Sequence, residues 1–175
     1  MSVTAPDLTY RFATPADVGA VAALIERAYR GAEAATGWTN ETDLLVSPRS
    51  DADEVGRLVA DPDSRFLLAE AGGELVACVL LQCRGEECYF GMFAVDPRRQ
   101  AGGVGSAVVA ASEDAARRLW SSQAMSMSVI SLRTELIAWY ARRGYALTGT
   151  SEPFPFGDKP ALRTDFDLVH LRKQL

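Results

Sequence analysis

The strongest constraint on the fold is the stretch Tyr89–Ser106, which reads YFGMFAVDPRRQAGGVGS. The apolar run Tyr89–Val95 predicts a buried strand, and Pro97 ends it because proline cannot donate to a sheet ladder. A basic, glycine-rich turn follows at 98–105, and then a helix begins. The unpaired first-turn N–H groups and the helix dipole favour an anion there, and glycine lets a ligand approach the backbone. This stretch therefore predicts a site for a phosphorylated ligand.

Known phosphate-binding motifs differ in how well they match this turn. A P-loop requires a lysine and then Ser or Thr after its last glycine, whereas Gly105 is followed by Ser106 and Ala107, so a P-loop is excluded. A dinucleotide fingerprint starting at Gly103 would place Val108 at the sixth position, and no acidic residue ends the next predicted strand. An ordinary β–α turn without a ligand remains an alternative.

Length and composition indicate one globular domain. The chain has 175 residues, 48% of them hydrophobic and 23% charged, so we expect a single domain over residues 1–175. The formal net charge of −5 and the lack of a dominant basic stripe argue against nucleic acid as a partner. The N-terminus has no apolar signal region and no segment approaches the ~20 apolar residues of a membrane span, so we predict a cytoplasmic protein without a membrane partner.

The rest of the chain alternates between predicted strands and helices without a linker. Residues 31–50 are the exception, and we expect a long loop there that carries Trp38 and Glu41. The predicted strands are Thr9–Phe12, Arg65–Glu70, Glu74–Gln82, Tyr89–Val95, Ala124–Ile130, Tyr145–Thr150 and Asp165–Leu171. The first predicted helix begins at Thr14-Pro15. The other predicted helices are Asp51–Ala60, Val104–Trp120 and Thr134–Arg143.

Some chemically active residue types are predicted to be structural. Glu113 and its charged neighbours should form the solvated face of their helix, and the only histidine, His170, is interpreted as an edge-strand residue. Neither a metal site nor a nucleophile–histidine set is expected around His170. The odd number of cysteines, without a CxxC pair, predicts three small buried hydrophobes: Cys78, Cys83 and Cys88.

Two motifs resemble those of the GNAT superfamily of N-acetyltransferases. The spacing Gln100-x-x-Gly103-x-Gly105 is similar to the (Arg/Gln)-x-x-Gly-x-(Gly/Ala) pyrophosphate loop of that superfamily. The stretch Trp139–Tyr145, WYARRGY, resembles the aromatic-Tyr-x-x-x-Gly-aromatic pattern of a later helix. Because both motifs occur in the expected order and separation, the chain is identified as a member of the superfamily.

The resemblance implies a fold and a cosubstrate. The expected fold is α/β (α+β), with a mixed, mostly antiparallel central sheet whose central strands splay apart, flanked by helices. The cosubstrate is acetyl-CoA, whose pantetheine would bond the strand backbone at Phe93, Ala94 and Val95. Gly91 fits a bulge or close approach in this strand. The loop residues expected to bind the pyrophosphate are Gln100, Ala101, Gly102, Gly103, Val104, Gly105 and Ser106.

The resemblance also suggests catalytic residues. Tyr140 occupies the position that protonates the leaving CoA thiolate in many GNAT enzymes, although packing beside Trp139 alone would also explain it. Glu41, near Trp38, is the candidate for amine binding or water-mediated base action, with an exposed loop carboxylate as the alternative.

Two positions depart from the superfamily pattern. The strand carboxylate of some histone-type enzymes corresponds to Tyr89, which cannot be a carboxylate base, and Glu86 and Glu87 are interpreted as solvated turn charges. Arg133 stands where many members carry an asparagine, and it would bind a phosphate or an acidic acceptor group, or pair with Glu135.

Taken together, the sequence predicts a GNAT-fold N-acetyltransferase that uses acetyl-CoA and, with Tyr140 as general acid, acetylates the primary amine of a small molecule or peptide. The alternative is a non-catalytic acyl-CoA-binding sensor or partner module with the same fold. A homodimer is left open by the resemblance, and the acceptor cannot be read from the residues.

Overall fold

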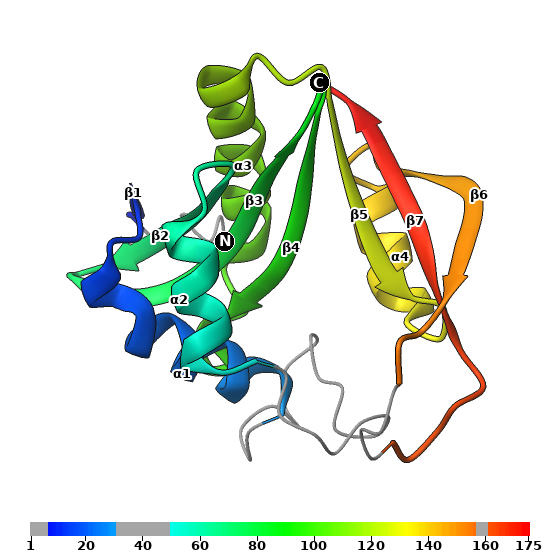
Figure 1. The fold of residues 1–175 in the computed structure, drawn as a ribbon, viewed down its shortest axis with the longest axis horizontal. Coiled ribbons are helices and arrows are strands. Elements are labelled where there is room, and N and C mark those ends of the chain that lie inside the picture. Colours follow the sequence, from blue (N-terminus) through cyan, green and yellow to red (C-terminus); the bar gives the residue numbers. More distant parts are fainter. Residues whose placement is uncertain (1–6, 31–49, 157–160) are drawn as a thin grey trace.

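The centre of the structure, a computed structural model that describes residues 7–30, 50–156 and 161–175, is a mixed sheet. Its strand order is β1-β2-β3-β4-β5-β7-β6, and every neighbouring pair is antiparallel except β4 and β5 (Figure 1). The strands are β1 (Thr9–Phe12), β2 (Ser64–Ala71), β3 (Glu74–Arg84), β4 (Glu87–Val95), β5 (Ala124–Ile130), β6 (Ala146–Pro153) and β7 (Asp167–Gln174).

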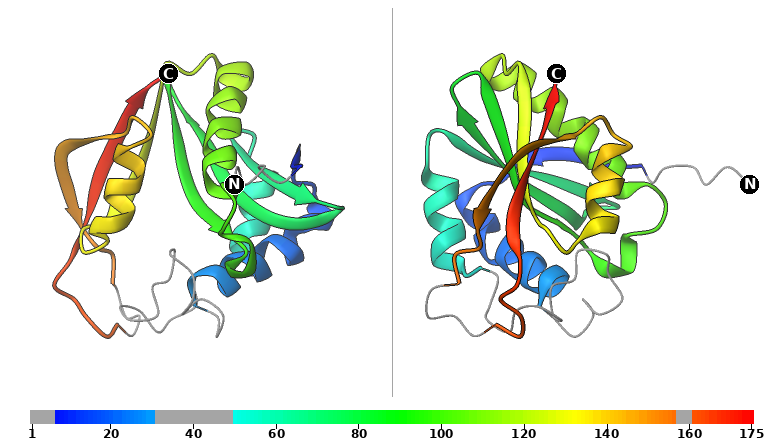
Figure 2. Two further views of the ribbon diagram at one scale, coloured as in Figure 1. Left: turned by 180° about the vertical axis from the view of Figure 1, so that it is seen from behind. Right: turned by 90° about the vertical axis from the view of Figure 1, so that its right-hand side faces the viewer.

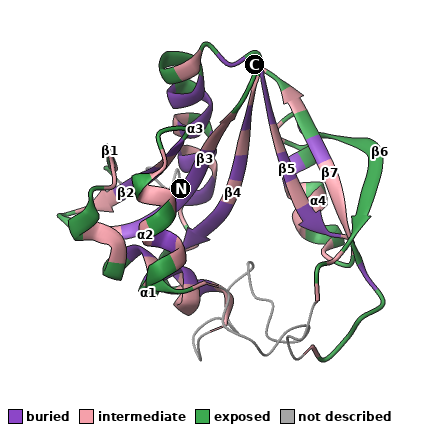
Figure 3. Ribbon diagram, viewed as in Figure 1, coloured by how far each residue is buried: buried purple, intermediate pink, exposed green. Residues whose placement is uncertain are grey.

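Helices cover both faces of the sheet (Figure 2). On one face, α1 (Val18–Tyr29) and α2 (Ala52–Ala60) bury apolar residues against β2, β3 and β4. On the other face, α3 (Val104–Trp120) and α4 (Thr134–Ala141) pack over a core to which β2 to β5 and β7 contribute. The strands β2, β3 and β4 are largely buried, whereas every residue of β6 is exposed (Figure 3).

The two central strands diverge after a short pairing. β4 and β5 pair only from Glu87 with Ala124 to Tyr89 with Ser126, although both strands continue well beyond. We call the stretches that no longer pair with each other, 90–95 of β4 and 127–130 of β5, the splay. The predicted mixed, mostly antiparallel sheet with splayed central strands and flanking helices is thus confirmed.

A β-bulge accompanies the splay. The β3–β4 register shifts between the pairs Leu80 with Gly91 and Cys78 with Ala94, so β4 contains one extra residue. Met92 lies within it at a positive φ of 46°. A bulge bends its strand and increases its twist, which turns β4 away from β5. The expected bulge beside Gly91 is therefore present.

Gly91 also leaves space for the side chain of its neighbour Tyr89. A Cβ atom built at this position would lie 2.7 Å from Cε1 of Tyr89, closer than any ordinary contact. The Tyr89 ring therefore covers the strand backbone where a side chain would otherwise project.

Local signals predicted most element ends. The Thr14 backbone N–H donates to the Asp17 carboxylate at 2.7 Å, and the Asp51 carboxylate accepts from the Glu54 N–H at 2.8 Å, as expected for helix N-termini. After α4, Gly144 has a φ of 93°, the left-handed conformation predicted for it. Cys78 and Cys88 are buried as expected, while Cys83 is half-buried. No helix in the described ranges has the length and apolarity that a membrane span requires.

Two predictions about charged residues were wrong. Glu113 is only 8% exposed, because its carboxylate accepts hydrogen bonds from the Lys173 ammonium at 2.8 and 3.0 Å and from the Tyr145 hydroxyl at 2.9 Å. His170 is not on an edge strand, since β7 lies between β5 and β6. The strand β6 also extends to Pro153, into the segment predicted as a loop.

The Glu113 cluster, defined as Glu113, Tyr145 and Lys173, joins α3 to the β5-β7-β6 half of the sheet. Burial, followed by the Glu113 charge, raises the pKa of Tyr145, so its hydroxyl remains a donor. We predict that Glu113→Ala lowers the free energy of unfolding by about 2–3 kcal/mol. This is less than the ~3–5 kcal/mol of a fully buried pair, because the Lys173 side chain keeps 27% exposure. Urea denaturation measures the change.

The control for this variant is Asp114→Ala on the same helix. Asp114 forms an exposed pair with Arg117 at 3.1 Å, and its removal should change stability by at most ~0.5 kcal/mol. Equal effects of the two substitutions would contradict the assigned role of the Glu113 cluster.

Candidate functional site

The edge of β4 presents backbone groups to the splay. The Asp96 N–H donates to the Val76 carbonyl of β3, so the alternate residues Phe93 and Val95 direct their backbone groups away from β3. The Tyr29 hydroxyl donates to the Phe93 carbonyl at 2.6 Å, and the Gln100 amide donates to the Val95 carbonyl at 3.2 Å. A polar chain lying along this edge would find the same acceptors.

Ala94 differs from these two neighbours. It pairs with Cys78 of β3, and its side chain is fully buried against the α1–α2 face. The sequence predicted that Phe93, Ala94 and Val95 all contact a ligand. In the structure, Phe93 and Val95 direct their backbone groups into the splay, whereas Ala94 directs its backbone groups toward β3.

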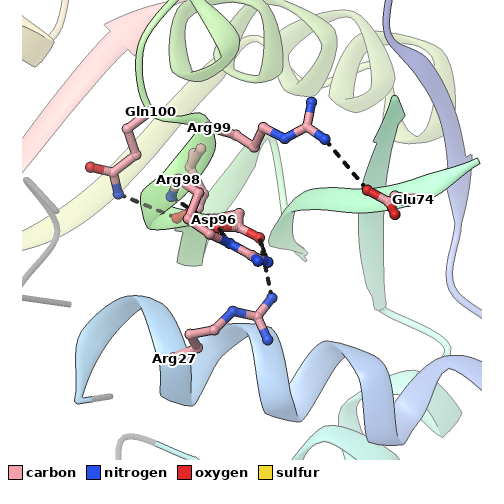
Figure 4. Close-up of polar contacts among 7 residues, drawn as sticks. Arg27, Glu74, Asp96, Arg98, Arg99 and Gln100 are labelled. Atoms are coloured by element: carbon pink, nitrogen blue, oxygen red, sulfur yellow. Dashed lines mark hydrogen bonds and ion pairs between the residues drawn. The ribbon is translucent and has the colours of Figure 1, made fainter. Parts of the chain in front are cut away.

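Asp96 anchors the corner between β4 and the helix α3 (Figure 4). Its carboxylate accepts from the backbone N–H of Arg98 at 3.0 Å and from the Arg98 guanidinium at 2.9 Å. Arg27 of α1 lies 3.4 Å from the same carboxylate. The Arg98 hydrogen bond is the main cause that lowers the pKa of Asp96 below its usual range. The carboxylate therefore stays ionised and holds the corner at neutral pH.

Both arginines that the sequence placed beside the anion site contact carboxylates. Arg98 turns back to Asp96, and Arg99 lies 3.4 Å from Glu74 at the surface (Figure 4). Exposed pairs of this kind are weak, so a bound phosphate could still compete for Arg99.

The glycine loop, residues 100–106, leads into α3. Gly102 and Gly103 have φ angles of 87° and 81°, which side-chain-bearing residues rarely adopt. Gly103 is the N-cap of α3, and a Cβ atom there would meet nothing within 4 Å, so its backbone is approachable. The first-turn N–H groups and the positive end of the 17-residue helix converge at this point. The residues present therefore fit an anionic group such as a pyrophosphate.

Arg143 supplies a positive charge that the sequence analysis missed. Its guanidinium donates to the Ser106 hydroxyl from Nε at 3.2 Å and also from Nη2, and Nη1 donates to the Trp139 carbonyl at 2.7 Å. It also stacks on the Trp139 ring at 3.4 Å. Burial lowers its pKa from the ordinary arginine value. The WYARRGY motif contains Arg143, but no local pattern shows that it meets the first turn of α3.

Tyr140 lies on α4 against the splay. Its ring packs edge-on against Phe90, the first residue of β4 beyond the pairing with β5, with centroids 6.3 Å apart, and against Tyr145 at 5.9 Å. Within the described ranges its hydroxyl makes no hydrogen bond. Desolvation raises its pKa well above the ordinary value. Tyr140 is therefore both a core residue and a protonated donor without a partner in this part of the chain.

A polar pocket lies on the opposite face of β4, β5, β6 and β7. Its volume is about 380 Å³, and residues that line it include Tyr89, Ser126, Ser128, His170 and Glu152. The register explains the grouping, because Tyr89 pairs with Ser126 and Ser128 pairs with His170, which places these side chains on one face. Glu87, predicted as a solvated turn charge, also lines the pocket and pairs with Arg172.

The remaining residues that the sequence singled out are Glu41, Trp38 and Arg133. Glu41 and Trp38 lie outside the described residues, so the candidate base Glu41 stays a prediction. Arg133 is the N-cap residue of α4, with its backbone N–H donating to the Ile130 carbonyl at 2.9 Å.

We predict that Arg143→Met raises the dissociation constant for acetyl-CoA about tenfold, equal to about 1.4 kcal/mol, because a charge beside the first turn of α3 is lost. Calorimetric titration at constant salt measures the change. Arg142→Met, at the exposed neighbouring position, is the matched control and should leave the dissociation constant unchanged. Equal values for the two variants would remove Arg143 from the phosphate site.

Several solved N-acetyltransferases and a protein solved with acetyl-CoA have a fold similar to that of this chain. The ribosomal-protein-S18-alanine N-acetyltransferase from Escherichia coli aligns with a TM-score of 0.71 at 16% identity, covering 95% of this chain and 93% of that chain. The spermidine/spermine N-acetyltransferase from Vibrio cholerae gives 0.68 at 15% identity, covering 95% and 92%. A Salmonella typhimurium protein solved with its cofactor acetyl-CoA gives 0.69 at 21% identity, covering 97% and 94%.

The sequence comparisons identify the family. The search of curated proteins gave no match. The profile of the acetyltransferase (GNAT) family matches residues 21–145, a stretch that includes β4, the glycine loop and Tyr140. Acetyl-CoA is the acetyl donor of this family, and the anion site at α3 fits its pyrophosphate. With both the fold and the sequence profile in agreement, this chain belongs to the GNAT acetyltransferase family.

Proposed function

We propose that this protein transfers the acetyl group of acetyl-CoA to a primary amine by direct attack. The observation that carries the proposal is the position of Tyr140, whose protonated hydroxyl has no partner among the described residues and whose ring contacts Phe90, the first residue of β4 beyond the pairing with β5. The glycine loop lies at the far end of the same strand.

The cosubstrate site proposed here extends from the glycine loop along β4. The backbone N–H groups of residues 100–106 hold the pyrophosphate, with Arg143 beside Ser106. The pantetheine follows the edge of β4, where the Phe93 and Val95 carbonyls accept hydrogen bonds. When bound, the cosubstrate supplies an acetyl thioester whose carbonyl carbon accepts the nucleophile.

The proton transfers follow from the chemistry of amines and thiols. An alkylammonium of pKa ~10.4 must lose a proton before its nitrogen can attack. As the C–N bond forms and the C–S bond breaks, the Tyr140 hydroxyl gives its proton to the departing sulfur. The second nitrogen proton returns to Tyr140 through solvent, so the enzyme regains its starting state.

Tyr140→Phe should lower kcat by about 10²–10⁴-fold and leave the acetyl-CoA affinity unchanged, because the ring packing is kept and only the proton donor is lost. Since burial raises the pKa of Tyr140 above ~10, the hydroxyl stays protonated over the usual assay range and contributes no loss of activity below that pH. Steady-state kinetics and calorimetry measure both quantities.

The control is Tyr10→Phe, which removes an exposed hydroxyl of β1 and should change neither constant. An unaltered kcat in Tyr140→Phe would exclude Tyr140 from the mechanism.

A non-catalytic acyl-CoA-binding module is the second candidate. Arg133 and Tyr89 favour it, because they replace the asparagine and the strand carboxylate seen in other members of the superfamily. Turnover separates the two candidates. Release of CoA thiol that depends on an amine supports the enzyme, whereas CoA binding without thiol release across a panel of amines supports the module.

The first test is a thermal-shift titration with acetyl-CoA, CoA and NAD, followed by an amine screen. Ligand at 100 times its Kd stabilises the folded state by ~2.7 kcal/mol, so acetyl-CoA and CoA should raise Tm and NAD should not. The screen uses spermidine, phosphinothricin and a peptide with N-terminal alanine, amines suggested by structural neighbours. No shift with either CoA form at millimolar concentration would overturn the proposed function.

A further inference from the structure

The polar pocket lies at the level where β4 and β5 part. Tyr89 with Ser126 is the last pair between the two strands, and Ser128 is two residues further along β5, on the same face. His170 is the β7 partner of Ser128. The register therefore places the His170 side chain beside the beginning of the splay, on the face opposite the α3–α4 core.

The local contacts hold His170 in one orientation. Its Nδ1 lies 3.0 Å from the Ser128 hydroxyl, and its strand is hydrogen-bonded on both sides, to β5 and β6. No carboxylate pairs with the ring among the described residues, and the residue is half-buried in the pocket lining. If Nδ1 carries the hydrogen and donates to Ser128, the other ring nitrogen keeps a lone pair that can accept a proton.

The charges around His170 nearly balance. Arg172 pairs with Glu87, and the Arg84 guanidinium lies 3.9 Å from the centre of the Tyr89 ring. The pocket is completed by Glu152 and by hydroxyl groups from β5 and β6. Among the described residues that line the pocket, the charged or titratable groups are Arg84, Glu87, Tyr89, Glu152 and Arg172. Two guanidinium and two carboxylate groups leave no strong field against an approaching ammonium group.

We propose that His170 is the catalytic residue that takes the proton from the acceptor, and that the polar pocket binds a small hydrophilic primary amine. The inference rests on the proposed function and names the base that Glu41 was expected to provide. Volume and lining support the substrate class, because about 380 Å³ lined by serine, threonine and charged side chains suits a compact polar molecule better than an apolar one.

In the proposed transfer, His170 acts on the amine and Tyr140 acts on the sulfur. The ammonium N–H proton passes to the free imidazole nitrogen, and the resulting lone pair forms the C–N bond to the acetyl carbon. The C–S bond then breaks, and the sulfur receives its proton from Tyr140 on the other face of the sheet. The second nitrogen proton returns to Tyr140 through solvent, and the imidazolium gives its proton to solvent, so the net products are the amide, CoA thiol and one released proton.

The kinetics of the His170→Asn variant test the catalytic role of His170. Asparagine can still form a hydrogen bond with Ser128, but it cannot act as a base near neutral pH. We expect kcat for alkylamines to fall about 10²-fold near neutral pH, part of the rate to return at high pH where more of the amine is neutral, and the acetyl-CoA affinity to remain unchanged. Hydroxylamine, a weakly basic nucleophile that is neutral at pH 7, should lose much less rate than spermidine or phosphinothricin in this variant.

Thr150→Val is the matched control within the pocket lining. It should raise KM for the amine and leave kcat near the wild-type value, which separates a binding contribution from proton transfer. If His170→Asn behaves like Thr150→Val, or if it slows hydroxylamine and the alkylamines equally, the base role is wrong.

A binding measurement reads out the pocket without turnover. Because the chain has one histidine, its imidazole NMR signals need no assignment by mutagenesis. An amine that is acetylated in the screen should shift these signals on titration in the presence of CoA. Turnover of an amine without any shift would overturn the pocket assignment alone, while absence of transfer from wild-type protein to every amine would overturn the proposed function together with this inference.

Discussion

The short pairing of β4 with β5 is the constraint on which the remaining structure depends. Three residue pairs join the two halves of the sheet, and beyond Tyr89 the backbone groups on the β5 side of β4 face no neighbouring strand. Unpaired backbone groups are costly when they are buried, and here side chains satisfy two of them: Tyr29 bonds the Phe93 carbonyl and Gln100 bonds the Val95 carbonyl. The bulge at Met92 and the ring of Tyr89 over Gly91 fit a strand bent in this way.

Because the sheet pairing is weak at this point, other contacts hold the halves together. The buried Glu113 cluster connects α3 with β7 and with the turn after α4, and the ring of Tyr140 bridges α4 to Phe90 of β4. Arg143 adds a third link from α4 to Ser106 in the first turn of α3. These links lie on one face of the sheet and bring the C-terminal half of the chain to the glycine loop.

The two faces of the splay carry different chemistry. On the α3–α4 face, helix N–H groups, Arg143 and the buried phenol of Tyr140 suit a phosphorylated thioester and its leaving thiolate. On the opposite face, a pocket with His170 and several hydroxyl groups suits an amine. The proposed proton acceptor and the proposed proton donor thus lie on opposite faces of the sheet.

By itself the sequence determined the features that local physics controls. The hydrophobic periodicity and the positions of proline and glycine predicted the bounds of β1, β5 and α3. The glycine spacing predicted an anion site at the N-terminus of α3. Each of these features depends on residues only a few positions apart. Tertiary structure alone decided which distant residues meet. Ser106 and Arg143 are 37 residues apart, Ser128 and His170 are 42 apart, and Glu113 and Lys173 are 60 apart. Strand order made β7 an inner strand and buried Glu113, and no local pattern encodes such contacts, since they arise only when the sheet is assembled.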